Sequence, residues 1–287
     1  GCNTFGVEPT KAAIEAKKKG HIIFKEYFDK TSSKNIRKKI GDIDIITFTN
    51  VFAHIEDLED LLFSLKNISN KNTLIIIENH YLGEVIKKTQ FDTFYHEHPR
   101  TYSLKSFVNI SKKIDVSLID FKFVKRYNGN IRVYLKSSGK IYKSTKKMNQ
   151  SLRLERLEIN KIKTFQKKVN KWKLNKKKQI EKIVKKFGPL PAKAFPGRAS
   201  ISINLLRLNS NHISKVYEKN SSLKVNKFIP GTDIKILKEK YFKVKHFDNG
   251  ILINLAWHIS NEIRNYLRRK MKFKGKIIDI ISNSDFK

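Results

Sequence analysis

Short β-branched runs alternate with amphipathic segments through the first half of the chain, and this alternation limits the possible folds most. It predicts strands and helices in this order: strand 4–8, helix 10–19, strand 21–24, strand 44–49, helix 57–65 and strand 74–77. Such an order is typical of α/β sheets built from βαβ units. The run 44–49 is continuous and apolar, so we expect it to be buried on both faces.

The character of the chain changes near Lys140. No Gly or Pro interrupts 151–187, and apolar residues recur there at helical spacing, which predicts one long amphipathic helix or a broken one. Further strands are predicted at 131–135, after the turn Asn128-Gly129, and at 214–217, 251–257 and 276–280. We therefore expect a first domain at 1–145, a basic helical connection at 146–187 and a smaller α/β domain at 188–287.

The chain is strongly basic, with 61 Lys and Arg against 26 Asp and Glu and a formal net charge of +35. This balance suits a nucleic-acid partner, but the lysines are spread along the chain and no RGG segment or RNP-like strand motif is present. We favour a solvated basic surface over a nucleic-acid partner. In a milder form, the positive field would attract an anionic small substrate.

Composition and the start of the chain exclude other classes. The single cysteine, Cys2, excludes an intramolecular disulfide framework and a multi-cysteine zinc site within this chain. The apolar runs are too short to cross a bilayer, and no secretory signal opens the sequence. We expect a cytoplasmic protein that does not span a membrane.

An acidic residue, Glu8, follows the first predicted strand. Ligands of open α/β sheets lie beyond the carboxyl ends of the strands, where a carboxylate can accept hydrogen bonds from ribose hydroxyls. The alternative is that Glu8 caps the following helix. A nucleoside-binding domain normally has an earlier strand and a Gly-rich turn before such an acid, so we expect the chain to be truncated at its N-terminus.

A second candidate is the run from Asn50 to His54, which follows the strand at 44–49. His54 stands where a side chain could reach a cofactor. The alternative is a residue that begins a helix or serves packing.

The densest cluster of proton-handling groups is Tyr95-His96-Glu97-His98. In an extended segment Tyr95 and Glu97 would share one face, whereas in a helix Tyr95 and His98 would align. A metal site fits poorly, because the spacing is not that of helical ligands and no second cluster contributes. General acid–base chemistry fits better, since histidine titrates near neutral pH.

In the second half, Arg198 follows the turn Pro196-Gly197 and could bind a diphosphate. The alternative is a tight turn with a surface arginine. Trp257 and His258 come at the end of a predicted strand, where we expect a core residue and a residue at its rim.

These motifs resemble those of S-adenosylmethionine-dependent sugar C-methyltransferases, enzymes that act on nucleotide-linked 4-keto-deoxysugars. The resemblance is carried by residues 7–9, 50–57, 91–98, 128–134, 194–200, 228–232 and 255–258, in that order. It implies a Rossmann-like class I methyltransferase domain, incomplete at its N-terminus and without its Gly-rich loop, followed by a C-terminal Rossmann-like α/β domain. It also implies an N-terminal zinc-binding cap, which is missing from this sequence, so zinc is expected only there.

The resemblance also assigns catalytic roles. Tyr95, Glu97 and His98 would surround the sugar, with His98 or Tyr95 as the base that removes a proton from the carbon beside the ketone. His54 would lie near the enolate oxygen or polarise the ketone.

S-adenosylmethionine and a nucleotide sugar are the implied ligands. Glu8 would hold the cofactor ribose, with Val51 and Phe52 packed near it, and Asn50 and Arg198 would contact the substrate. Three rivals stay open: methylation of an oxygen or nitrogen, a nucleic-acid-binding relative without activity, and an inactive fragment. The sequence does not predict the oligomeric state.

Overall fold

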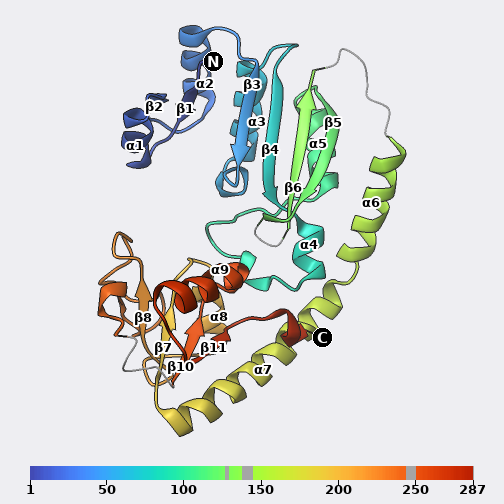
Figure 1. Ribbon diagram of the computed structural model, residues 1–287. Coiled ribbons are helices and arrows are strands. Elements are labelled where there is room, and N and C mark those ends of the chain that lie inside the picture. Colours follow the sequence, from blue (N-terminus) through green and yellow to red (C-terminus); the bar gives the residue numbers. More distant parts are fainter. Residues whose placement is uncertain (127–128, 138–144, 244–249, 287) are drawn as a thin grey trace. The chain divides into compact units, whose positions relative to one another are not determined.

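The computed structural model describes residues 1–126, 129–137, 145–243 and 250–286, which form two compact units (Figure 1). Unit 1 comprises Gly1–Leu82 and Glu97–Arg156, and unit 2 comprises Gly83–His96 and Leu157–Lys287. The domain limits predicted at 145 and 187 divide the chain in another way and stay a prediction.

Unit 1 contains a four-stranded sheet in the order β3-β4-β6-β5 and a separate parallel pair, β1-β2. β4 is parallel to β3 and antiparallel to β6, and β6 is antiparallel to β5. The elements of unit 1 are β1 (Phe5–Val7), α1 (Ala12–Lys18), β2 (Ile22–Phe24), α2 (Lys30–Ile40), β3 (Ile45–Thr49), α3 (Leu58–Ile68), β4 (Leu74–His80), α5 (Leu104–Lys113), β5 (Ser117–Val124) and β6 (Asn130–Lys136).

Capping side chains begin three helices of unit 1, α2, α3 and α5. Asp29 and Ser32 form a reciprocal capping box at the start of α2, and Ser103 and Ser106 form another at the start of α5. The Asp57 carboxylate accepts the Asp60 N–H at the start of α3. These contacts satisfy backbone donors that have no partner within the helix.

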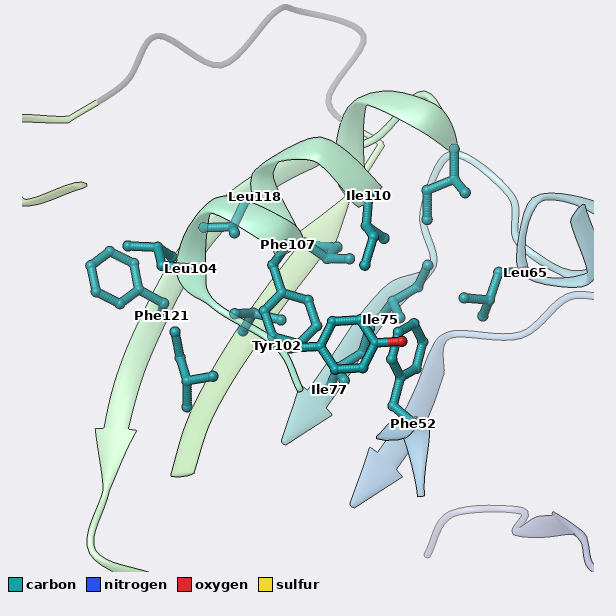
Figure 2. Close-up of a cluster of buried hydrophobic side chains, with 14 of the residues drawn as sticks. Phe52, Leu65, Ile75, Ile77, Tyr102, Leu104, Phe107, Ile110, Leu118 and Phe121 are labelled. Carbon is teal, nitrogen blue, oxygen red and sulfur yellow. The ribbon is translucent and has the colours of Figure 1, made fainter. Parts of the chain in front are cut away.

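One face of the sheet carries the core of unit 1, where side chains of α3 and α5 pack against β4, β5 and β6 (Figure 2). Ile75 and Ile77 of β4 are buried two residues apart, because alternate side chains of a strand share a face. Phe107 of α5 is fully buried and lies 6.2 Å from Phe52 between ring centroids. The core therefore joins both helices to the sheet.

The prediction that the run 44–49 is buried on both faces is wrong. β3 is the edge strand of its sheet among the described residues, with a hydrogen-bonded neighbour on one side only. Ile45 is 56% exposed, and Thr47 and Thr49 on the same face are exposed as well. Apolar composition therefore marked a strand, but not its position in the sheet.

Unit 2 is built on a parallel sheet in the order β11-β10-β7-β8-β9. Its elements are α7 (Ile162–Phe187), β7 (Leu190–Lys193), α8 (Ala199–Leu205), β8 (Ile213–Glu218), β9 (Ile236–Lys238), β10 (Ile251–Asn254), α9 (Ser260–Asn265) and β11 (Lys276–Asp279). The chain passes between the units within α4 (Leu82–Lys87), between His96 and Glu97, and within α6 (Lys146–Ile159). The two α/β units confirm the predicted fold class.

Several element predictions need correction. The helix predicted over 151–187 is broken: α6 ends at Ile159 and α7 begins at Ile162. The strand predicted over 251–257 ends at Asn254, and Trp257 begins a short 3-10 helix. β5, β7 and β9 were not predicted. Asn128 of the predicted turn lies outside the described residues.

β7 was not predicted because it contains Pro191, and a proline normally argues against a central strand. In the structure the pairing of β7 with β8 shifts register between Leu190 and Pro191. A proline has no N–H to donate, and a local irregularity accommodates that loss.

We predict that Phe107→Ala lowers the free energy of unfolding by about 3–5 kcal/mol, because it removes a fully buried ring at the centre of the core. Chemical denaturation measures this change. Phe63→Ala is the control, since Phe63 of α3 is 44% exposed, and we expect it to cost about 1 kcal/mol or less. Equal effects of the two substitutions would contradict the assigned core.

Candidate active site

The candidate site of unit 1 lies at the carboxyl ends of β3 and β4. These strands are parallel neighbours with Thr49 opposite Glu78, so the residues that follow each strand come to the same edge of the sheet. Asn50 follows β3 in the left-handed region (φ 54°), a conformation that asparagine tolerates better than most residues. The backbone then turns into a 3-10 helix, Phe52–His54.

Three histidines gather at this edge. The ring centroids of His54 and His98 are 4.7 Å apart, and those of His80 and His98 are 5.4 Å apart. Arg100 holds the segment of His98 in place, because its Nη1 donates to the carbonyl oxygens of Ile55 and Glu56. Two of the predicted site residues, His54 and His98, are therefore brought into contact.

His80 was missed by the sequence analysis. It is the last residue of β4 and is half-buried. The available signal was its position: the end of a strand parallel to β3 falls at the edge to which His54 was assigned.

A buried carboxylate organises the polar groups beside these histidines. Glu78 is 2% exposed, and its Oε2 accepts hydrogen bonds from Arg132 Nε (2.8 Å) and Nη2 (2.6 Å). Asn130 Nδ2 donates to Glu78 Oε1 (3.1 Å) and to Asn50 Oδ1 (2.9 Å). The Glu78 carboxylate raises the pKa of Arg132 through its hydrogen bonds and its charge. The Asn130 Oδ1 atom is buried and has no hydrogen-bond partner among the described residues.

The predicted cofactor residues occupy different environments. Glu8 is half-buried after β1, and its Oε1 accepts the N–H of Thr10 (2.8 Å), so it does support the turn that leads into α1. Val51 is 48% exposed, whereas Phe52 is fully buried in the core. In this structure Phe52 can therefore reach a cofactor only through its backbone.

The run Tyr95–His98 crosses the border between the units, so only Glu97 and His98 belong to unit 1 with His54. Tyr95 lies in a bend and residues 96–97 form a turn, which corrects both the extended and the helical alternatives. Glu97 is exposed and Tyr95 is half-buried.

In unit 2, Arg198 is 8% exposed, so the alternative of a surface arginine is wrong. Its guanidinium forms a two-pronged ion pair with the fully buried Asp92, with Nε to Oδ2 at 2.8 Å and Nη2 to Oδ1 at 2.5 Å. Trp257 Nε1 donates to the same Oδ2 atom (2.7 Å), and Trp257 is a core residue as predicted. Asp92 was not predicted as the partner of Arg198, from which it is 106 residues away in the chain.

His258 follows Trp257 and is half-buried. Burial, together with the nearby Arg198 charge, lowers the pKa of His258 to about 4, and the Asp92 carboxylate offsets part of this shift. Within the described ranges, no group of three or more His, Cys, Asp and Glu residues is arranged to hold a metal ion. Nor does any helix of those ranges have the length and apolar character needed to cross a bilayer.

Comparison with known proteins identifies the family. Residues 126–281 match the family model of the C-methyltransferase C-terminal domain, which is more than half of the chain, and residues 1–119 match that of a methyltransferase domain. The chain therefore belongs to the C-methyltransferase C-terminal domain family. This confirms the resemblance to S-adenosylmethionine-dependent C-methyltransferases that the motifs indicated.

A curated relative agrees with this family. C-methyltransferase NovU of Streptomyces niveus is 27% identical over 135 residues, which are 47% of this chain and 32% of that protein. The chain thus spans about a third of the length of the curated relative it matches.

Solved structures were also compared. An S-adenosylmethionine-dependent methyltransferase from Archaeoglobus fulgidus is 12% identical over 46% of this chain and 75% of its own, with a TM-score of 0.36. Magnesium protoporphyrin IX methyltransferase from Synechocystis is 13% identical over 47% of this chain and 64% of its own, with a TM-score of 0.34.

We predict that Glu78→Gln lowers the free energy of unfolding by about 2–3 kcal/mol, because it removes the charge that Arg132 and Asn130 satisfy in a buried position. Asp120→Asn is the matched acid-to-amide control, because the Asp120 side chain, which pairs with Lys147, is 45% exposed. We expect the control to cost less than about 1 kcal/mol in the same denaturation experiment.

The lowered pKa of His258 predicts a pH dependence of stability. Between the ordinary pKa of 6.5 and the folded value of about 4, the unfolded chain binds a proton that the folded chain does not. The contribution of neutral His258 to the free energy of unfolding is therefore fully present above pH 6.5. It falls by roughly 3 kcal/mol at most as the pH drops to 4. Denaturation curves of the parent and of His258→Gln across this range should diverge, with the flatter profile in the variant. Parallel profiles would contradict the shift.

Proposed function

We propose that this chain carries the methyltransferase centre and C-terminal domain of an S-adenosylmethionine-dependent enzyme that methylates a carbon beside the ketone of a nucleotide-linked keto-deoxysugar. The contact between His54 and His98 carries this proposal. Two imidazoles in contact at the ligand edge of an α/β sheet can divide acid and base roles between them. Methylation of an oxygen or nitrogen would need no removal of a carbon-bound proton, so the histidine pair favours a carbon acceptor.

The proposed base is His98, and Tyr95 is the alternative. Removal of a proton from the carbon beside a ketone leaves an enolate, whose oxygen must be stabilised as its charge develops. His54, which contacts the His98 ring, would donate a hydrogen bond to that oxygen, and Glu97 lies next to His98 in the chain. His80 packs on the His98 ring and would fix the orientation of that ring.

The residues after β1 and β3 suit a nucleoside cofactor. Glu8 offers a half-buried carboxylate at the carboxyl end of β1, which can accept hydrogen bonds from ribose hydroxyls. The exposed Val51 and the backbone of Phe52 would line the place beside it. S-adenosylmethionine, when bound, would supply an electrophilic methyl group.

Asn50 and Asn130 are the proposed sugar contacts in unit 1. The buried Asn130 Oδ1 has no hydrogen-bond partner among the described residues, so it is an acceptor that a hydroxyl group could satisfy. The positive net charge of the chain would attract the diphosphate of a nucleotide sugar.

We predict that His98→Asn in the full gene product slows exchange of solvent deuterium into the carbon beside the ketone by at least about 100-fold, because the base is removed. Mass spectrometry or proton NMR of a nucleotide-linked 4-keto-deoxysugar follows this exchange. His96→Asn is the matched control, since His96 is an exposed histidine of the same run, and we expect an exchange rate close to that of the parent. Unchanged exchange in His98→Asn would exclude His98 as the base.

A further inference from the structure

The strand order of unit 2 reverses between β7 and β10. The chain adds β8 and β9 on one side of β7, then returns to add β10 and β11 on the other side. In open parallel sheets this reversal opens a crevice at the carboxyl ends of the two strands, where nucleotides commonly bind. Arg198 follows β7 and Trp257 follows β10, so both lie at this point.

A segment from earlier in the chain already occupies these two side chains. Asp92, on the short 3-10 helix Phe91–Thr93, is fully buried, and its two oxygens accept from Arg198 and Trp257. Arg198 Nη2 also donates to Thr93 Oγ1 (3.0 Å), and the guanidinium lies 5.3 Å from the centre of the Trp257 ring. Donors that could bind an anionic ligand are therefore satisfied by the protein's own carboxylate.

Aromatic residues on either side of Asp92 pack against the long helix α7. Phe91 lies 4.7 Å from Trp172, and Phe94 lies 6.2 Å from Phe165, between ring centroids. Trp172 and Phe165 are both buried. The segment 91–94 is thus held by hydrogen bonds through Asp92 and Thr93 and by ring contacts through its two phenylalanines.

We propose that Asp92, Arg198 and Trp257 form an anchor that positions Tyr95, which belongs to the same unit and is the first residue of the proton-handling run. Tyr95 is three residues beyond Asp92, so the chain lets the two residues lie at most about 10 Å apart. A two-pronged, fully desolvated ion pair fixes both the place and the rotation of its partner. Arg198 is then a positioning residue and not a contact of the substrate diphosphate, because its guanidinium is already paired with Asp92.

This inference depends on the proposed function only in the role given to Tyr95–His98, and amide hydrogen exchange tests the anchor without any activity. In Arg198→Met we expect amides 94–98 to exchange at least about tenfold faster, because the buried ion pair with Asp92 no longer holds the segment against the sheet of unit 2. Arg198→Lys keeps the positive charge but loses the planar guanidinium that makes two hydrogen bonds to Asp92, and we expect an intermediate exchange rate. Peptides of β8 and β9 should stay unchanged.

Arg264→Met is the matched control. Arg264 pairs with Asp279 at the carboxyl end of β11 in the same sheet, and its removal should leave amides 94–98 as protected as in the parent. Equal acceleration throughout unit 2 in Arg198→Met, or none at 94–98, would overturn the anchor. If Arg198→Met does not fold, Trp257→Phe tests the anchor by the same exchange measurement. It removes the donor to Asp92 Oδ2 and keeps a buried ring, so we again expect faster exchange at 94–98.

Kinetics of the full gene product separate positioning from stability. For Arg198→Lys we expect kcat to fall at least about tenfold while KM for S-adenosylmethionine stays within about twofold, because the cofactor residues are untouched. An unchanged kcat with faster exchange at 94–98 would overturn the positioning role. If the parent lacks methyl transfer, the proposed function fails, and the exchange result alone decides whether the anchor exists.

Discussion

The burial of a carboxylate is the constraint on which the arrangement of unit 2 depends. A fully desolvated charge such as that of Asp92 is tolerated only if it is paired and hydrogen-bonded. Arg198 and Trp257 meet this requirement together, and they come from the ends of two strands that the chain places side by side. Satisfying one carboxylate therefore links an early segment of the chain to the sheet formed by its last third.

Unit 1 solves a similar problem with Glu78. Here the partners are Arg132 of the neighbouring antiparallel strand and Asn130, which in turn holds Asn50. The pairing secures the backbone at the point where β3 ends and the chain turns toward His54. The histidines that we propose for acid–base chemistry thus follow strand ends that hydrogen bonds tie together.

The large positive charge has more than one use. Most lysines are exposed, but Lys193 is 3% exposed and pairs with Glu239, and Lys176 is 5% exposed and pairs with Asp285. These two contribute to the interior of unit 2 as structural ions. The choice between a solvated surface and an anionic partner for the remaining lysines stays a prediction.

The sequence by itself determined the class of fold, most strand positions, the helices α1, α3, α6 and α7, and the family, because hydrophobic periodicity and local motifs are written in neighbouring residues. His54 and His98 could be singled out in this way, since each belongs to a distinctive run. The exposure of β3 could not be predicted, because burial depends on which strands become neighbours. The roles of His80, Glu78 and Asp92 were also decided only by tertiary structure. Each acts through partners between 18 and 165 residues away, and a spacing of that size carries no local signal.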